Sequence, residues 1–145
     1  MNLIEIIKES WSWVGIEPDE ILGENEFGNL IIRDKLDKYW RLCPEDLYCK
    51  VIAENREQLD ALSTNQKFLA DWYMSSLTNQ AKEKLGELEH GQKFHLAIPG
   101  VLGGEYEIGN IRIISHIEQI RFSGEIAHQI AELPDGAKIK LNIVE

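Results

Sequence analysis

"FGNLIIRDKLDKYWRLCPEDLYCKVIA", residues 27–53, decides the fold class. Three apolar and aromatic runs, at 27–34, 39–44 and 48–53, are separated by a Lys-Leu-Asp-Lys turn and by a second break at Pro44. Short apolar runs between turn-forming residues are typical of strands in an antiparallel meander. Because proline cannot donate to a strand ladder, we expect a turn at Pro44 rather than a continuous strand.

The residues before this meander form a helix and then an acidic segment. Residues 2–14 predict an amphipathic helix that ends at Gly15 and Pro18, because its apolar residues recur at helical spacing. The next stretch, 15–27, contains five acids and no base. It fits either a solvated loop or a docking surface for a positively charged protein. The acids are Glu17, Asp19, Glu20, Glu24 and Glu26.

The residues after the meander are predicted to be helical from 53 to 91. Asn55 and Asn65 are candidate helix caps, and Gly86 and Gly91 weaken and then end the run. An aromatic-rich apolar stripe at helical spacing favours a core position over a ligand-stacking surface. The stripe consists of Phe68, Leu69, Trp72, Tyr73 and Leu77.

The last third alternates strands with one helix. Residues 93–99 and 106–115 predict strands, and Ser115 followed by Glu118 predicts the capped start of a helix. A turn at 134–136 then leads into a terminal strand at 137–144, in which lysines alternate with aliphatic residues. The expected fold class is α+β, with helices packed on a mainly antiparallel sheet in a single domain, 1–145. The helix face expected to meet the sheet consists of Ile117, Ile120, Gly124, Ala127 and Ala131.

Composition narrows the possible partners. The formal charge is −10, which repels phosphate backbones, so we expect no direct nucleic-acid binding. No apolar run is long enough to span a bilayer, and the N-terminus lacks a signal-peptide pattern, so we expect a cytoplasmic protein with no membrane association. Cys43 and Cys49 are too few and too close to form a disulfide framework, so we expect reduced thiols.

The glycine-rich stretch "IPGVLGGEY", residues 98–106, raises the possibility of a phosphate-binding loop. Such a loop lies between a strand and a helix and is followed by Lys-Ser/Thr, whereas here a strand follows and Glu105 adds negative charge. The pattern therefore favours a tight connection between strands.

The polar residues predict no catalytic, cofactor-binding or metal-binding site. The four histidines lack metal-ligand spacing, and no serine lies in a nucleophile-elbow motif. A small enzyme whose site assembles from dispersed residues stays open as an alternative. Its candidate groups are Cys43, His95, Glu105 and His116.

Residues from about Trp11 to about Ile130 resemble a known family. The segments that carry the resemblance are Gly28-Asn29, Tyr39-Trp40, Pro44-Glu45, Asp71-Trp72 and Pro99–Asn110. They are similar to the C-terminal domain of type VI secretion immunity proteins of the Tdi type. The strand-rich first half is distantly similar to the SMI/KNR-like immunity superfamily.

This resemblance implies a non-enzymatic protein that binds and neutralises one cognate antibacterial toxin, typically a nuclease, inside the producing cell. An acidic surface suits a nuclease with a basic cleft. We therefore nominate the acidic segment for partner binding, with the neighbouring Trp13 as aromatic anchor. The alternative is a protein-protein interaction adaptor of the same fold. The identity of the toxin and the oligomeric state stay open. The nominated residues are Trp13, Glu17, Asp19, Glu20, Glu24 and Glu26.

Overall fold

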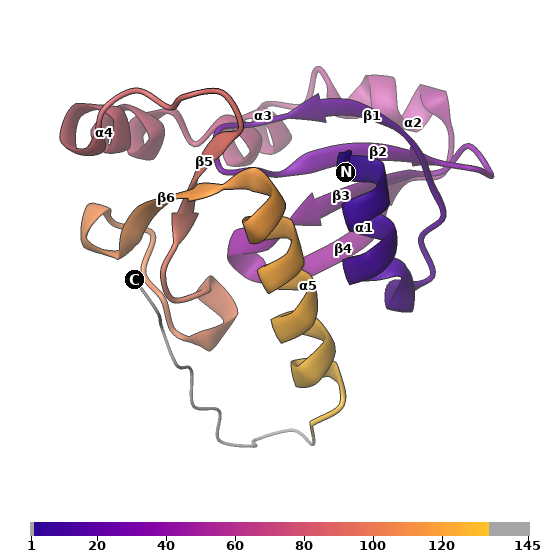
Figure 1. Ribbon diagram of the computed structural model, residues 1–145. Helices are drawn as coiled ribbons and strands as arrows, with labels where there is room; N and C mark the ends of the chain where they lie inside the picture. Colours follow the sequence, from indigo (N-terminus) through magenta and orange to yellow (C-terminus); the bar gives the residue numbers. More distant parts are fainter. Residues whose placement is uncertain (1, 134–145) are drawn as a thin grey trace.

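The computed structural model describes residues 2–133, and the predicted turn at 134–136 and strand at 137–144 lie outside these residues. The α+β prediction is confirmed, with helices packed on antiparallel sheets (Figure 1). The elements in chain order are α1 (Leu3–Trp11), a 3-10 turn (Ser12–Val14), β1 (Pro18–Glu24), β2 (Leu30–Asp34), β3 (Tyr39–Cys43), a 3-10 turn (Pro44–Asp46), β4 (Tyr48–Ala53), α2 (Arg56–Leu62), α3 (Gln66–Tyr73), α4 (Ser75–Leu85), β5 (Gln92–Leu96), two 3-10 turns (Gly100–Leu102 and Ile108–Asn110), β6 (Ile111–Ser115) and α5 (His116–Ala131).

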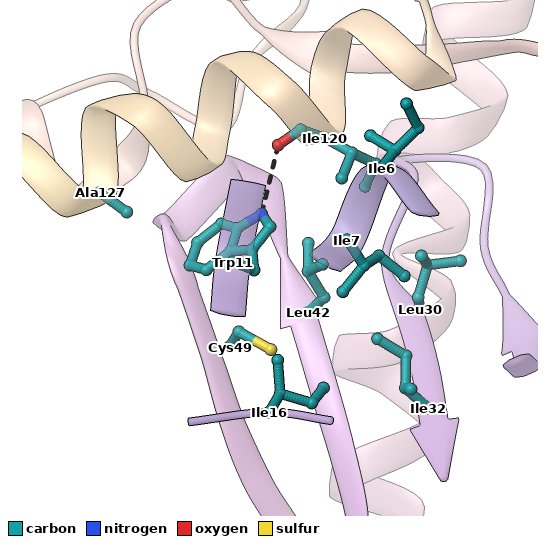
Figure 2. Close-up of a cluster of buried hydrophobic side chains, with 10 residues drawn as sticks. All are labelled: Ile6, Ile7, Trp11, Ile16, Leu30, Ile32, Leu42, Cys49, Ile120 and Ala127. Atoms are coloured by element: carbon teal, nitrogen blue, oxygen red, sulfur yellow. Dashed lines mark hydrogen bonds between the residues drawn. The ribbon is translucent and has the colours of Figure 1, made fainter. Parts of the chain in front are cut away.

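The predicted meander forms a four-stranded antiparallel sheet in the order β1-β2-β3-β4. Helices α1 and α5 pack against each other and cover one face of this sheet, as Figure 1 shows. The first core cluster lies between these two helices and the sheet, as Figure 2 shows. Within it the indole Nε1 of Trp11 donates to the Ile120 carbonyl at 3.2 Å. The cluster consists of Ile6, Ile7, Trp11, Ile16, Leu30, Ile32, Leu42, Cys49, Ile120 and Ala127.

Asp34 organises the predicted Lys-Leu-Asp-Lys turn between β2 and β3. One carboxylate oxygen accepts from the backbone N–H groups of Leu36 and Lys38, and the other accepts from the Trp40 indole at 2.8 Å. Burial would raise the pKa of the Asp34 carboxyl, but these hydrogen bonds outweigh it and lower the pKa below its ordinary value.

The second sheet is a separate hairpin of β5 and β6, which packs with α4 around a second core cluster. Gln119 of α5 joins this cluster to the turn before β2, because its Nε2 donates to the carbonyls of Phe27 and Phe94. Gly28 has φ +78°, and an added Cβ there would lie 1.8 Å from Gln119 Oε1, so glycine is required at this turn. The second cluster consists of Phe27, Ala81, Phe94, Leu96 and Ile111.

Two predicted boundaries are wrong. The acidic segment is not a loop, because residues 18–24 form strand β1, paired to β2 with two register shifts that keep Asp19 and Glu20 on the outside. Of the predicted strand at 106–115, only 111–115 is strand. The Asn110 side chain bonds the backbone of Ile98 and Glu105, and this closes a loop instead of extending the ladder.

The helical predictions are largely confirmed. The predicted run 53–91 divides into α2, α3 and α4, with Asn55 and Asn65 capping the first two, but it ends at Leu85, before Gly86, rather than at Gly91. Ser115 caps α5. Gly124 does allow a close approach, but the neighbour is Ser10 of α1 rather than the sheet. Tyr73 is 60% exposed and does not join the core. Within residues 2–133, no helix has the length and apolar character needed to cross a membrane.

Candidate functional site

The residues of the predicted acidic surface form two groups, one at each end of β1. At one end, Asp19 and Glu20 both contact the Arg33 guanidinium, at 2.7 and 3.0 Å, and Asp37 lies 3.8 Å from the same group. Glu17 is exposed nearby and has no ion pair within the described residues, 2–133. We call these four acids the acidic end of β1. They outnumber the adjoining cations Arg33 and Lys35, whose backbone N–H donates to the Glu17 carbonyl.

At the other end of β1 the acids are neutralised by cations of the same chain. Glu24 binds Lys93 and Glu26 binds Lys82, each at 2.9 Å. The hydrogen bond from Lys93 lowers the pKa of the Glu24 carboxyl. Glu24 and Glu26 therefore tie the first sheet to β5 and α4, and they offer little free charge to a partner.

The Trp13 side chain is already packed and hydrogen-bonded within its own chain. Its ring stacks on Trp11 and on His128, at 5.8 and 4.6 Å between centroids, and its Nε1 donates to the Ser10 carbonyl. It lines a polar cleft of about 300 Å³ between α1 and α5, together with Glu125. The structure thus places Trp13 in a stack on α5, apart from the ion pairs of β1.

A buried polar cluster fixes α3 to the opposite face of the sheet from α1. Arg41 is 4% exposed, donates to Asn29 and Asp71, and lies under the rings of Phe68 and Trp72. Asn29 in turn donates to both carboxylate oxygens of Glu45. Burial raises the pKa of the Glu45 carboxyl. Asn29, Arg41 and Glu45 are buried and contact one another, whereas the Asp71 carboxylate that Arg41 binds is exposed.

The glycine-rich stretch is a tight connection between β5 and β6, as the sequence indicates. Backbone N–H groups of Leu102, Gly103 and Gly104 donate to the carbonyls of Pro99 and Gly100. An added Cβ at Gly104 would lie 1.7 Å from the Ile98 carbonyl oxygen, so only glycine allows this close approach. Because these donors are used within the loop, the loop lacks the converging N–H groups that a phosphate site needs.

The loop forms one wall of an open groove whose other wall is α4. We call it the α4 groove, and its volume is about 480 Å³. More of its lining is apolar than polar. The residues that line it are Ala70, Met74, Ser75, Ser76, Leu77, Gln80, Tyr106 and Glu107.

The candidate enzyme groups do not form one site in the described residues. Both cysteines are buried and free, and burial raises the pKa of Cys43 far above its usual range and that of Cys49 to about 12. The His116 ring contacts the Gly28 carbonyl, whereas His95 lies on β5 facing Arg112. Within residues 2–133, no group of three or more His, Cys, Asp or Glu side chains could hold a metal ion.

Residues 53–127, more than half of the chain, match the family model described as T6SS immunity protein Tdi1, C-terminal. The chain belongs to this family. No curated protein matches this Tdi1-family chain. Type VI secretion immunity is therefore its functional class.

The family match covers the chain that follows the four-stranded sheet. It begins at the end of β4 and runs through α2, α3, α4, the β5–β6 hairpin and most of α5. The α4 groove lies wholly within the matched residues of this Tdi1-family chain, whereas Trp13 and the five acids of residues 17–26 precede them.

Sequence reasoning missed the α4 groove. The sequence places Tyr106 in a predicted strand and Tyr73 in a predicted core stripe, so neither is considered for a surface. The signal that could have pointed to the groove is Tyr106 beside Glu107, directly after the glycine-rich stretch. Aromatic residues are enriched at protein interfaces.

Proposed function

We propose that this protein, acting as one domain of residues 1–145 in the cytoplasm of the producing cell, neutralises a cognate nuclease toxin by binding it rather than by catalysis. The observation that carries the proposal is the family match over residues 53–127. The charge of −10 supports the nuclease part, because a nuclease presents a basic cleft to its phosphate substrate.

The acidic end of β1 is the proposed source of long-range attraction between the two proteins. Its Glu17, Asp19 and Glu20 are exposed and together with Asp37 outnumber the neighbouring cations Arg33 and Lys35. Charges at the rim of an interface raise the association rate more than they slow dissociation. Glu24 and Glu26 add less, because Lys93 and Lys82 neutralise them. Trp13 is the aromatic residue proposed to contact the partner, from its stack on α5.

Co-expression with the product of the neighbouring gene tests the function. The proposal expects the host to survive only when both proteins are made, the two proteins to co-purify, and the freed partner to degrade DNA or RNA. A harmless neighbour with no complex would contradict the proposal. Weak capture of several unrelated partners would favour the adaptor alternative instead.

Charge reversal tests the role of the acidic end. Glu17→Lys with Glu20→Lys should slow association about tenfold at low salt and leave the dissociation rate nearly unchanged. The matched control is Glu83→Lys with Glu87→Lys, which makes the same change in net charge on and after α4. Equal effects from both pairs would mean that only the overall charge matters.

A further inference from the structure

We propose that the α4 groove holds a protruding apolar side chain of the toxin, flanked by a lysine or arginine of the toxin. This inference rests on the proposed function, because it names the surface that supplies affinity in the same complex. A few anchored side chains in a desolvated centre normally carry most of the binding free energy between proteins.

Tyr106 forms an aromatic wall of the groove. The residue is 42% exposed, and its ring lies against the backbone at Gly100, beside the Asp46 carboxylate. Gly100 makes this arrangement possible, because an added Cβ there would lie 2.3 Å from an Asp46 oxygen and 3.1 Å from the Tyr106 ring. An exposed aromatic ring that is already held in place loses little conformational entropy when a partner packs against it.

Met74 and Leu77 form the apolar floor of the groove, and both pack against the second core cluster. Met74 has φ 45° in the left-handed region, which turns the chain between α3 and α4 and brings the start of α4 to the groove. The floor is thus supported by the core beneath it. A methionine side chain can also adapt to the shape of the residue that enters.

The charge of the groove selects a basic partner. Among the described residues that line it, Glu107 carries a negative charge and none is a lysine, arginine or histidine. A phosphate or an acidic peptide would be repelled here, whereas an apolar residue beside a lysine or arginine would contact both the floor and Glu107. Such a segment is expected on a protein that binds nucleic acid.

Neighbouring positions on α4 provide a matched test. Gln80 lines the groove, whereas the adjacent Asn79 is exposed and does not line it. Gln80→Arg places a bulky cation in the groove and should weaken binding to the neighbouring gene's purified product at least about tenfold, mainly through faster dissociation. Asn79→Arg adds the same charge to the same helix and should change the dissociation constant less than about threefold.

Two milder variants keep the test interpretable if Gln80→Arg disturbs folding. Glu107→Gln should weaken binding a few-fold and reduce its salt dependence, and Tyr106→Ala should weaken it about tenfold or more. All variants are compared with the wild type for thermal unfolding and for mass by sedimentation.

The outcomes separate this inference from the proposed function. If the wild type binds the product but Gln80→Arg, Glu107→Gln and Tyr106→Ala bind equally well, the groove is not the anchor, although the proposed function stands. If the wild type forms no complex, the proposed function fails and the groove has no toxin to hold. A groove variant that changes the mass of the free protein instead of toxin binding assigns the groove to self-association and overturns the inference.

Discussion

The two halves of the molecule are held together in different ways. The half built from α1, the four-stranded sheet and α5 surrounds a continuous core in which Ile6, Trp11, Leu30 and Leu42 are each 0% exposed. The other half has a smaller core of its own, the second cluster around Phe94, but α2 has no buried residue and α3 has only Trp72, whose ring lies against Arg41 of β3. The larger core therefore lies in the first half, and the second half presents the α4 groove and most of the residues that the family model matches.

Removing Trp11 should have the largest effect on the first half. Trp11→Ala empties a site between α1, the sheet and α5 and removes the hydrogen bond to Ile120, so the free energy of unfolding should fall by about 3–5 kcal/mol. Urea denaturation measures this change. A loss below about 1 kcal/mol would mean that this half does not carry the stability assigned to it.

Removing Arg41 should loosen the second half. Arg41→Met leaves Asn29 and Glu45 buried without the guanidinium, and we expect a loss of about 2–3 kcal/mol together with faster amide exchange in α3. Hydrogen exchange with urea denaturation measures both.

Arg56→Met is the control for Arg41→Met. It removes an exposed surface pair with Asp60 and should leave the free energy of unfolding nearly unchanged. If the two variants behave alike, the buried cluster does not hold α3 in place.

The contact between α1 and α5 is the next test. An added Cβ at Gly124 would lie 2.4 Å from the Ser10 carbonyl oxygen, so Gly124→Ala should force the helices apart and cost about 2 kcal/mol. At Gly109 an added Cβ meets nothing within 4 Å, so Gly109→Ala should be nearly neutral. Thermal unfolding of both variants measures the difference, and equal midpoints would contradict the close packing.

Acid should weaken the β5–β6 hairpin before it weakens the Asp34 turn. Burial and the nearby Arg112 lower the pKa of His95 to about 4. A histidine whose folded pKa is lowered contributes fully above its unfolded pKa of about 6.5, and stability falls as the pH drops from there towards the folded pKa.

The His95→Gln variant isolates this effect. We expect the wild type to lose about 1–2 kcal/mol between pH 6.5 and 4 through His95, and His95→Gln to remove that part of the slope. Burial also lowers the pKa of His116, which therefore acts in the same direction and remains in the variant. The carboxyl of Asp34, whose pKa is lowered, becomes important only at lower pH. Superimposable stability profiles of variant and wild type would contradict the role of His95.

The sequence predicts the regular part of this fold well, because its signals are local. The alternation of apolar runs and turn residues at 27–53 gives the meander, and the Asn and Ser caps mark helix starts. Three features depend on contacts between distant residues and could not be predicted. They are the separate second sheet, which Gln119 joins to the first, the pairing of the acidic segment with β2, and the packing of Tyr106 beside Asp46 at Gly100. The ion pairs that neutralise Glu24 and Glu26 are of the same kind.

Hydrogen exchange of the free protein and of its complex with the neighbouring gene's product tests the central claim most directly. The claim is that the toxin is anchored on the second half, whereas the acidic end of β1 and Trp13 in the first half contribute at the rim of the interface. We predict that the amides of residues 74–80 and 105–107 become the most strongly protected in the complex, and that those of α1 and α5 change less. Protection confined to the cleft around Trp13, or no complex at all, would contradict the account.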